Sequence, residues 1–251
     1  GESDPEHIID MVNSGELTVE RIDESVRRIL INKFDLGLFE QAMVDEGLVD
    51  SLVRKPEYIS AGLDAQRKSI VLLKNEASKG HTLPAAEGKR IFIDGLDVDQ
   101  AKSFGNVVSS PDQADIIILY LPTVFNGNQA PGSNGLIDKF LSGILPDGDL
   151  TYGSDILKKA KTYADYATLI TVVDLNRPAI LTELNKFSDG LIGTFGVYDS
   201  ILYEVIFGQF SPQGKLPFEI PSSMESVENQ KEDLPDDSES PIFEFGHGLS
   251  Y

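Results

Sequence analysis

Four short, almost uniformly apolar runs are the feature that most limits how this chain can fold. Runs of this length are typical of strands buried on both faces, as in parallel sheets. Between some of them, 155–166 and 200–207 have helical spacing. This alternation predicts an α/β fold in which a mostly parallel sheet is sandwiched between helices. The apolar runs are 90–93, 116–121, 169–173 and 191–195.

Residues 5–34 have a different pattern, that of two helices interrupted at 13–15. Thr18 is the expected N-cap of the second helix, and one face of that helix is apolar. These helices have no core of their own to cover. They must therefore pack on a neighbouring layer, either the later domain or something that this chain lacks. The apolar face carries Ile22, Val26, Ile29 and Leu30.

The chain divides into three predicted parts, 1–40, 41–88 and 89–251. The middle part begins with an acidic linker up to residue 55, and residues 56–75 then indicate a helix that ends in the apolar run SIVLLKN. Residues 76–88 contain Gly80, Pro84 and Gly88 and are predicted to form a loop. The α/β sandwich is expected to occupy 89–251.

Charge and composition exclude several classes of function. The formal net charge is −20, which disfavours nucleic acid and anionic membrane surfaces as partners. The chain has no cysteine and only three well-separated histidines, so no metal site is expected. It has no apolar run long enough to span a membrane. Because GxGxxG, phosphate-loop and GxSxG motifs are absent, neither a nucleotide cofactor nor a serine nucleophile is expected.

In parallel sheets, functional loops follow the carboxyl ends of the strands. Here these are the segments after Asp94, Leu121, Leu175 and Phe195. The segment after Leu121 is long and rich in Gly, Asn and Pro, and it runs to Tyr152. Loops of this length are usually functional or disordered, and the sequence leaves both alternatives open.

Five segments, in this order along the chain, resemble the family 3 glycoside hydrolases. VNSGELTVERIDESVRRILINKFDLGLFE is similar to the end of that family's amino-terminal barrel and the start of its linker. SIVLLKNE resembles the lead-in to the second domain. DLNRPAIL and FGQFSPQGKLPFEIPSSME resemble the middle and late parts of that domain, and FEFGHGLSY resembles its end. These segments are 12–40, 69–76, 174–181, 207–225 and 243–251.

The resemblance implies that residues 1–40 are the terminal helices of a barrel that is otherwise absent, and that 89–251 is the second domain of a retaining, exo-acting β-glycosidase. Such enzymes use two carboxyl groups, one as nucleophile and one as acid/base. In this family the nucleophilic Asp belongs to the barrel, commonly in a Ser-Asp-Trp sequence, and this chain contains no tryptophan. The chain alone is therefore expected to be inactive.

Many family members take the acid/base Glu from the loop that corresponds to the segment after Leu121. Here the segment starts with Thr123, Val124, Phe125 and Asn126, without a Glu. An Asp in partial burial could donate a proton in its place. The alternative for each loop acid is solvation or an Asx-turn, as in LPDGDL. The acids of this loop, and hence the candidates, are Asp138, Asp147 and Asp149.

Three further residues have a functional and a structural interpretation. Phe125 could contact a sugar face, and the donor fork of Arg177 could hold a sugar hydroxyl or an acidic loop. Packing at the loop base is the alternative for Phe125, and a structural role is the alternative for Arg177. His247 lies between two glycines, so it is expected to cap the closing segment rather than transfer a proton.

The implied partners are a carbohydrate substrate, such as a β-glucoside or an oligosaccharide, and the enzyme's own amino-terminal barrel. The resemblance also allows a homodimer. The missing loop Glu favours a second hypothesis, in which the domain is a non-catalytic module for carbohydrate binding, stabilisation or dimerisation. A third, in which the chain is an autonomous α/β binding protein, leaves the apolar face of its first helices uncovered.

Overall fold

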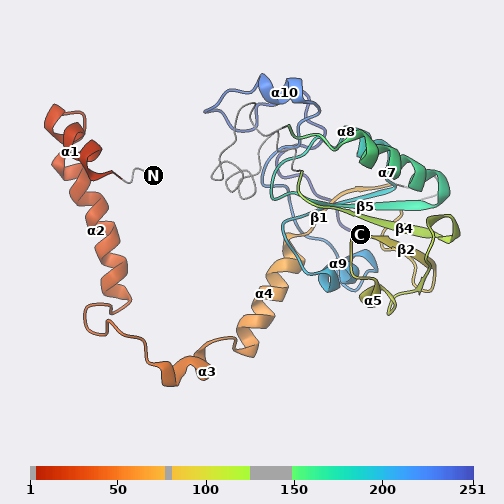
Figure 1. Ribbon diagram of the computed structural model, residues 1–251, viewed down its shortest axis with the longest axis horizontal. Coiled ribbons are helices and arrows are strands. Elements are labelled where there is room, and N and C mark those ends of the chain that lie inside the picture. Colours follow the sequence, from red (N-terminus) through yellow and green to blue (C-terminus); the bar gives the residue numbers. More distant parts are fainter. Residues whose placement is uncertain (1–3, 77–80, 125–148) are drawn as a thin grey trace, which may run out of the picture. The chain divides into compact units, whose positions relative to one another are not determined.

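The computed structural model describes residues 4–76, 81–124 and 149–251, and these form two compact units. The first unit ends at Pro56 and the second begins at Glu57. The positions of these two units relative to one another are not determined (Figure 1).

The first unit is helical. Gly15, in the left-handed conformation at φ 80°, ends α1, and the Thr18 hydroxyl accepts a hydrogen bond from the Arg21 N–H at 3.2 Å, which confirms the predicted N-cap of α2. None of residues 4–56 is buried, so the apolar side chains of this unit have no core. The elements of the unit are α1 (Pro5–Ser14), α2 (Val19–Asp35), a 3₁₀ turn (Glu46–Leu48) and α3 (Val49–Leu52).

The second unit is built on a six-stranded sheet in the order β1-β6-β5-β4-β2-β3. Strands β2 to β6 are parallel, whereas β1 pairs antiparallel with β6. The predicted α/β fold with a mostly parallel sheet is confirmed. The strands are β1 (Val71–Asn75), β2 (Arg90–Asp94), β3 (Asn106–Val107), β4 (Ile116–Leu121), β5 (Thr168–Asp174) and β6 (Gly190–Thr194).

The helix predicted over 56–75 was wrong in its last part. Helix α4 (Pro56–Ser69) ends before the apolar run, and residues 71–75 form β1. Val71 and Leu72 are both fully buried, but they belong to core clusters on opposite faces of the sheet. A run that is buried on both faces has no periodicity that separates a strand from a helix end.

Helices cover both faces of the sheet, as Figure 1 shows. On one face, α7 (Ser154–Tyr166) and α8 (Thr182–Phe187) pack on a cluster that includes Leu119 and Val173. On the other face, α5 (Val98–Ala101) and α9 (Asp199–Ile206) pack on Ile118 and Val172. Consecutive strand residues thus face different layers, which explains why the predicted strands are apolar throughout. A 3₁₀ turn (Pro111–Gln113) and α10 (Met224–Glu228) complete the described elements.

The carboxy-terminal segment closes the β1 edge of the sheet. The Leu249 N–H donates to the Leu72 carbonyl at 2.8 Å, and His247 Nε2 lies 2.8 Å from the Leu73 carbonyl oxygen. A carbonyl can only accept, so Nε2 of the imidazole carries the donated proton. The structure therefore places His247 as a cap on the closing segment, as predicted.

Candidate functional site

The topological switch point of the sheet lies between β2 and β4, since β2 continues to β3 on one side and β4 continues to β5 on the other. At its carboxyl edge, Asp94 accepts hydrogen bonds from Tyr163 at 3.0 Å and Lys159 at 2.8 Å. Burial and the hydrogen bond to Asp94 raise the pKa of Tyr163 to about 12. These groups satisfy one another, so they form a polar brace between β2 and α7.

The long segment after β4 is described only at its two ends. Candidate residues Phe125, Asp138 and Asp147 lie outside the described residues. Asp149 is exposed, and its Oδ1 accepts from the N–H and the hydroxyl of Thr151 at 2.8 and 2.6 Å. This is the Asx-turn geometry that the sequence offered as the alternative for this acid.

Both ends of the segment are fastened next to the chain that follows β5. The Tyr152 hydroxyl donates to the Pro122 carbonyl at 3.0 Å, and the Ile180 N–H donates to the Leu150 carbonyl at 2.8 Å. Arg177 lies in the same place, with its Nη1 3.5 Å from the Val124 carbonyl oxygen. The structure thus places Arg177 at the base of the loop.

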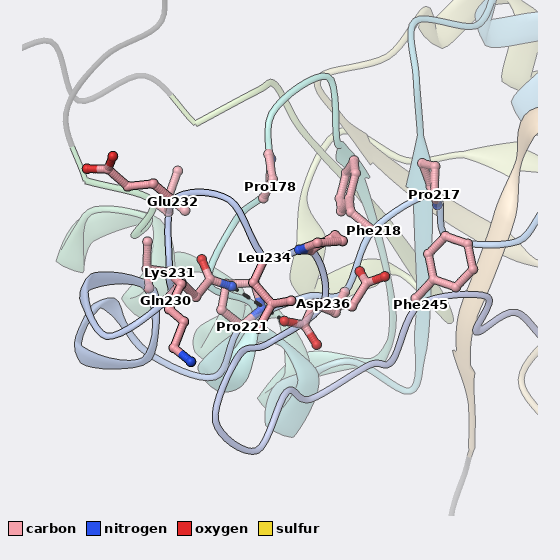
Figure 2. A pocket seen from close by; sticks show the side chains of 14 residues that line it. Pro178, Pro217, Phe218, Pro221, Gln230, Lys231, Glu232, Leu234, Asp236 and Phe245 are labelled. Carbon is pink, nitrogen blue, oxygen red and sulfur yellow. Dashed lines mark hydrogen bonds between the residues drawn. The ribbon is translucent and has the colours of Figure 1, made fainter.

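A hollow of about 630 Å³ opens beside this loop base, within the size range of small-molecule sites. Its lining combines prolines and aromatic rings with acidic and amide side chains. In Figure 2, Phe218 and Phe245 lie on one side of the lining and Glu232 at the opposite side. The lining residues are Leu150, Pro178, Pro217, Phe218, Glu219, Pro221, Val227, Gln230, Lys231, Glu232, Leu234, Pro235, Asp236 and Phe245.

Glu219 differs from the other acids of the hollow because it is buried, with an exposed fraction of 8%. Its Oε1 accepts from the Ser238 N–H at 2.5 Å and from Gln230 Nε2 at 3.4 Å. Glu232 and Asp236 are exposed. The hollow therefore holds one fixed carboxyl group and two solvated ones.

Sequence reasoning missed this hollow, although it expected a functional loop after β5. The lining comes from four stretches, around 150, 178, 217–236 and 245, which only the tertiary fold brings together. One signal was available. Glu219 is the only charged residue in LPFEIP, a stretch that is otherwise apolar, and an acid in such a place is buried only with partners.

Two further features of the described residues bear on other classes of site. In 4–76, 81–124 and 149–251, no three His, Asp or Glu side chains are grouped as a metal ion requires. In the same residues, no helix has both the length and the apolar character needed to cross a membrane.

Comparison with known proteins gives a family match over 170–251, to the model of the glycosyl hydrolase family 3 C-terminal domain. Over its whole length the chain is 35% identical to a probable β-glucosidase C of Aspergillus flavus and 34% identical to a periplasmic β-glucosidase/β-xylosidase of Dickeya chrysanthemi. It spans 38% and 37% of the length of these relatives.

Solved structures show the same fold. A β-glucosidase of Listeria innocua in complex with glucose aligns with 97% of this chain, at a TM-score of 0.64 and 19% identity. The aligned part is 40% of that protein. At this identity the likeness supports the α/β architecture alone.

Proposed function

We propose that this chain forms the second domain of a retaining, exo-acting β-glycosidase of β-glucosidase type, because residues 170–251 match the model of the glycosyl hydrolase family 3 C-terminal domain. The observation that carries the proposal is the 34–35% identity, over the full chain, to proteins named as β-glucosidases. The substrate would be a β-glucoside or a short oligosaccharide.

The proposed division of labour follows from the chemistry of retention. A retaining glycosidase needs two carboxyl groups about 5–5.5 Å apart, one on each side of the glycosidic bond. The nucleophilic Asp would lie on an amino-terminal barrel, in the part of the relatives' length that this chain does not span. The chain would then be inactive alone, and its hollow beside the loop base would form one wall of the sugar cleft.

The acid/base is proposed to be one of Asp138, Asp147 and Asp149, with Phe125 and Arg177 contacting the substrate. The position of Arg177 at the loop base supports this assignment, since its guanidinium could hold the loop or a sugar hydroxyl. The Asx-turn at Asp149 makes this acid the least suited of the three, because its Oδ1 already accepts two hydrogen bonds.

The barrel is the proposed protein partner of the first unit. Helix α2 exposes Val26, Ile29 and Phe34, which are 45–60% accessible. An apolar helix face of this kind needs a covering layer. A homodimer is the weaker proposal, because no feature of the described residues favours it over the barrel.

The alternative function is that of a non-catalytic module for carbohydrate binding, stabilisation or dimerisation. The absence of Glu from the start of the loop favours it. The two functions differ in what the loop acids do.

Release of nitrophenol from aryl β-glucosides separates the proposals. The chain alone should release none, and release would contradict the assignment of the nucleophile. A chimera in which this chain replaces the matching part of the Aspergillus flavus relative should be active. In that chimera, loss of rate in one of D138N, D147N or D149N that azide restores would identify the acid/base. Full activity of all three would favour the module.

A further inference from the structure

Glu219 is a buried carboxyl group whose hydrogen-bonding capacity is only half used by the fold. Its Oε1 takes both hydrogen bonds that the side chain accepts within the described residues. Its Oε2 has no partner there and is not among the fully enclosed atoms, and Glu219 lines the hollow. No ion pair joins Glu219 to a described Lys or Arg. Because buried carboxylates normally have partners on both oxygens, the free oxygen suits a ligand.

The backbone next to Glu219 is held by hydrogen bonds to a neighbouring segment. Ile220 pairs antiparallel with Phe243, through Ile220 N–H to the Phe243 carbonyl at 2.8 Å and Ile242 N–H to the Ile220 carbonyl at 2.9 Å. From the other side, the Ser238 N–H and the Gln230 amide fix the carboxyl group itself. A group held in this way loses little conformational entropy when it binds a ligand.

Two apolar side chains of the hollow are exposed rather than used for the core. Phe245 is 61% accessible and Leu234 is 48% accessible. An aromatic ring can pack its face on the C–H groups of a ligand, while its edge stays in water. The hollow thus offers an apolar platform next to a fixed acceptor.

The polar part of the hollow is rich in acceptors. Glu232 and Asp236 add two exposed carboxylates, and Lys231 provides one ammonium group. Ionised carboxylates only accept hydrogen bonds, so the fitting ligand carries several donors and no negative charge. A glycosyl unit has this character, with hydroxyl donors around its rim and C–H groups on its faces.

We propose that the hollow binds one glycosyl unit of a neutral saccharide, with Glu219 Oε2 accepting from its hydroxyls and Phe245 packing on its face. The inference rests on the proposed β-glycosidase function, since it assigns a sugar-binding position to this domain. It goes further in naming a site outside the long loop, with Glu219 as its central residue.

Saturation-transfer NMR on the 251-residue chain tests the site with methyl β-glucoside as the probe. The wild type should bind, and E219Q should bind about tenfold more weakly, because an NH2 donor then replaces the charged Oε2 acceptor that faces the ligand's hydroxyl groups. The amide oxygen of Gln still accepts from Ser238, so the loop should stay in place. F245A should also weaken binding. E228Q is the matched control, because Glu228 is exposed, lies in the same stretch and lines none of the hollow.

Three results would overturn the inference. The first is no binding by the wild type. The second is binding by E219Q and F245A that equals that of E228Q and the wild type. Glu219 would then have only a structural role, as the acceptor for the Ser238 N–H. The third is tighter binding of choline, which would make the ligand a cation. None of these touches the assignment as a β-glycosidase domain, which fails separately if the chimera is inactive while its parent relative hydrolyses aryl glucosides. Thermal melting of each variant shows whether it is folded.

Discussion

Gly248, in the terminal FGHGLSY sequence, permits a close approach of two backbone segments. A Cβ atom at position 248 would lie closer than 3.0 Å to the carbonyl oxygen of Gly214. Because both partners are backbone, neither can move without disturbing the segment that closes β1. Overpacking of this kind costs about 1–3 kcal/mol. We expect G248A to lower the free energy of unfolding by about 2–3 kcal/mol.

Two other glycines provide matched variants in which a Cβ atom meets no close neighbour. Gly246 has φ 78° and open space around it, so G246A should cost about 1 kcal/mol from the left-handed backbone alone. Gly62 lies inside α4 with no neighbour within 4 Å, so G62A should stabilise the second unit by about 0.5–1 kcal/mol. The order of stability should be G62A, wild type, G246A, G248A.

Urea unfolding followed by tyrosine fluorescence measures this series. The chain has no tryptophan, and all eight tyrosines lie in 57–251, so the signal reports the second unit alone. If G248A unfolds at the wild-type urea midpoint, or at the same midpoint as G246A, the close approach of the two segments carries no cost and the reasoning is wrong.

Two further predictions concern a buried pair and an exposed one. The hydroxyls of Thr171 and Ser188 are buried and 2.7 Å apart, so T171V and S188A should each lower the free energy of unfolding by about 1–3 kcal/mol. The double variant should cost less than the sum of the two, because it leaves no unpaired hydroxyl. Additive free energies from the same urea assay would contradict this. The hydrogen bonds from Arg90 lower the pKa of Asp115 to about 2, below its unfolded value of about 3.9. The stability that this pair contributes is thus present above pH ~4 and lost toward pH ~2. The melting temperatures of wild type and D115N should therefore differ at pH 7 and converge on acidification. A difference that persists at pH 2 would refute the assignment.

The fold was predictable where one physical rule dominated. The apolar runs of β4 and β5 are buried by helices on both faces of the sheet. Their uniformly apolar character was therefore enough to predict buried strands. The run at 71–75 has the same character, but it follows α4 without a Gly or Pro to mark the boundary. Only its pairing with β6 and with Leu249 distinguishes it as a strand, and that pairing is a tertiary fact.

The site was less predictable because strand-end reasoning selects places rather than residues. It drew attention to Arg177, which lies beside the loop base. It directed attention to the acids of the long loop, because family chemistry requires a proton donor there. Glu219 is far from any strand of the main sheet in sequence, and its significance depends on Ser238 and Gln230 folding back over it.

The terminal FEFGHGLSY sequence has two roles, one in closing the domain and one in lining the hollow. Phe243 is 9% accessible and pairs through its carbonyl with Ile220, whereas Phe245 is 61% accessible and lines the hollow. The ladder of backbone hydrogen bonds that closes the domain thus also fixes the chain next to Glu219 and the chain next to Phe245. Loosening it, as G248A should, would disturb both sides of the hollow at once, whereas E219Q would change one acceptor and leave the ladder intact. G248A should therefore lower both the ligand affinity and the stability, whereas E219Q should lower the ligand affinity alone.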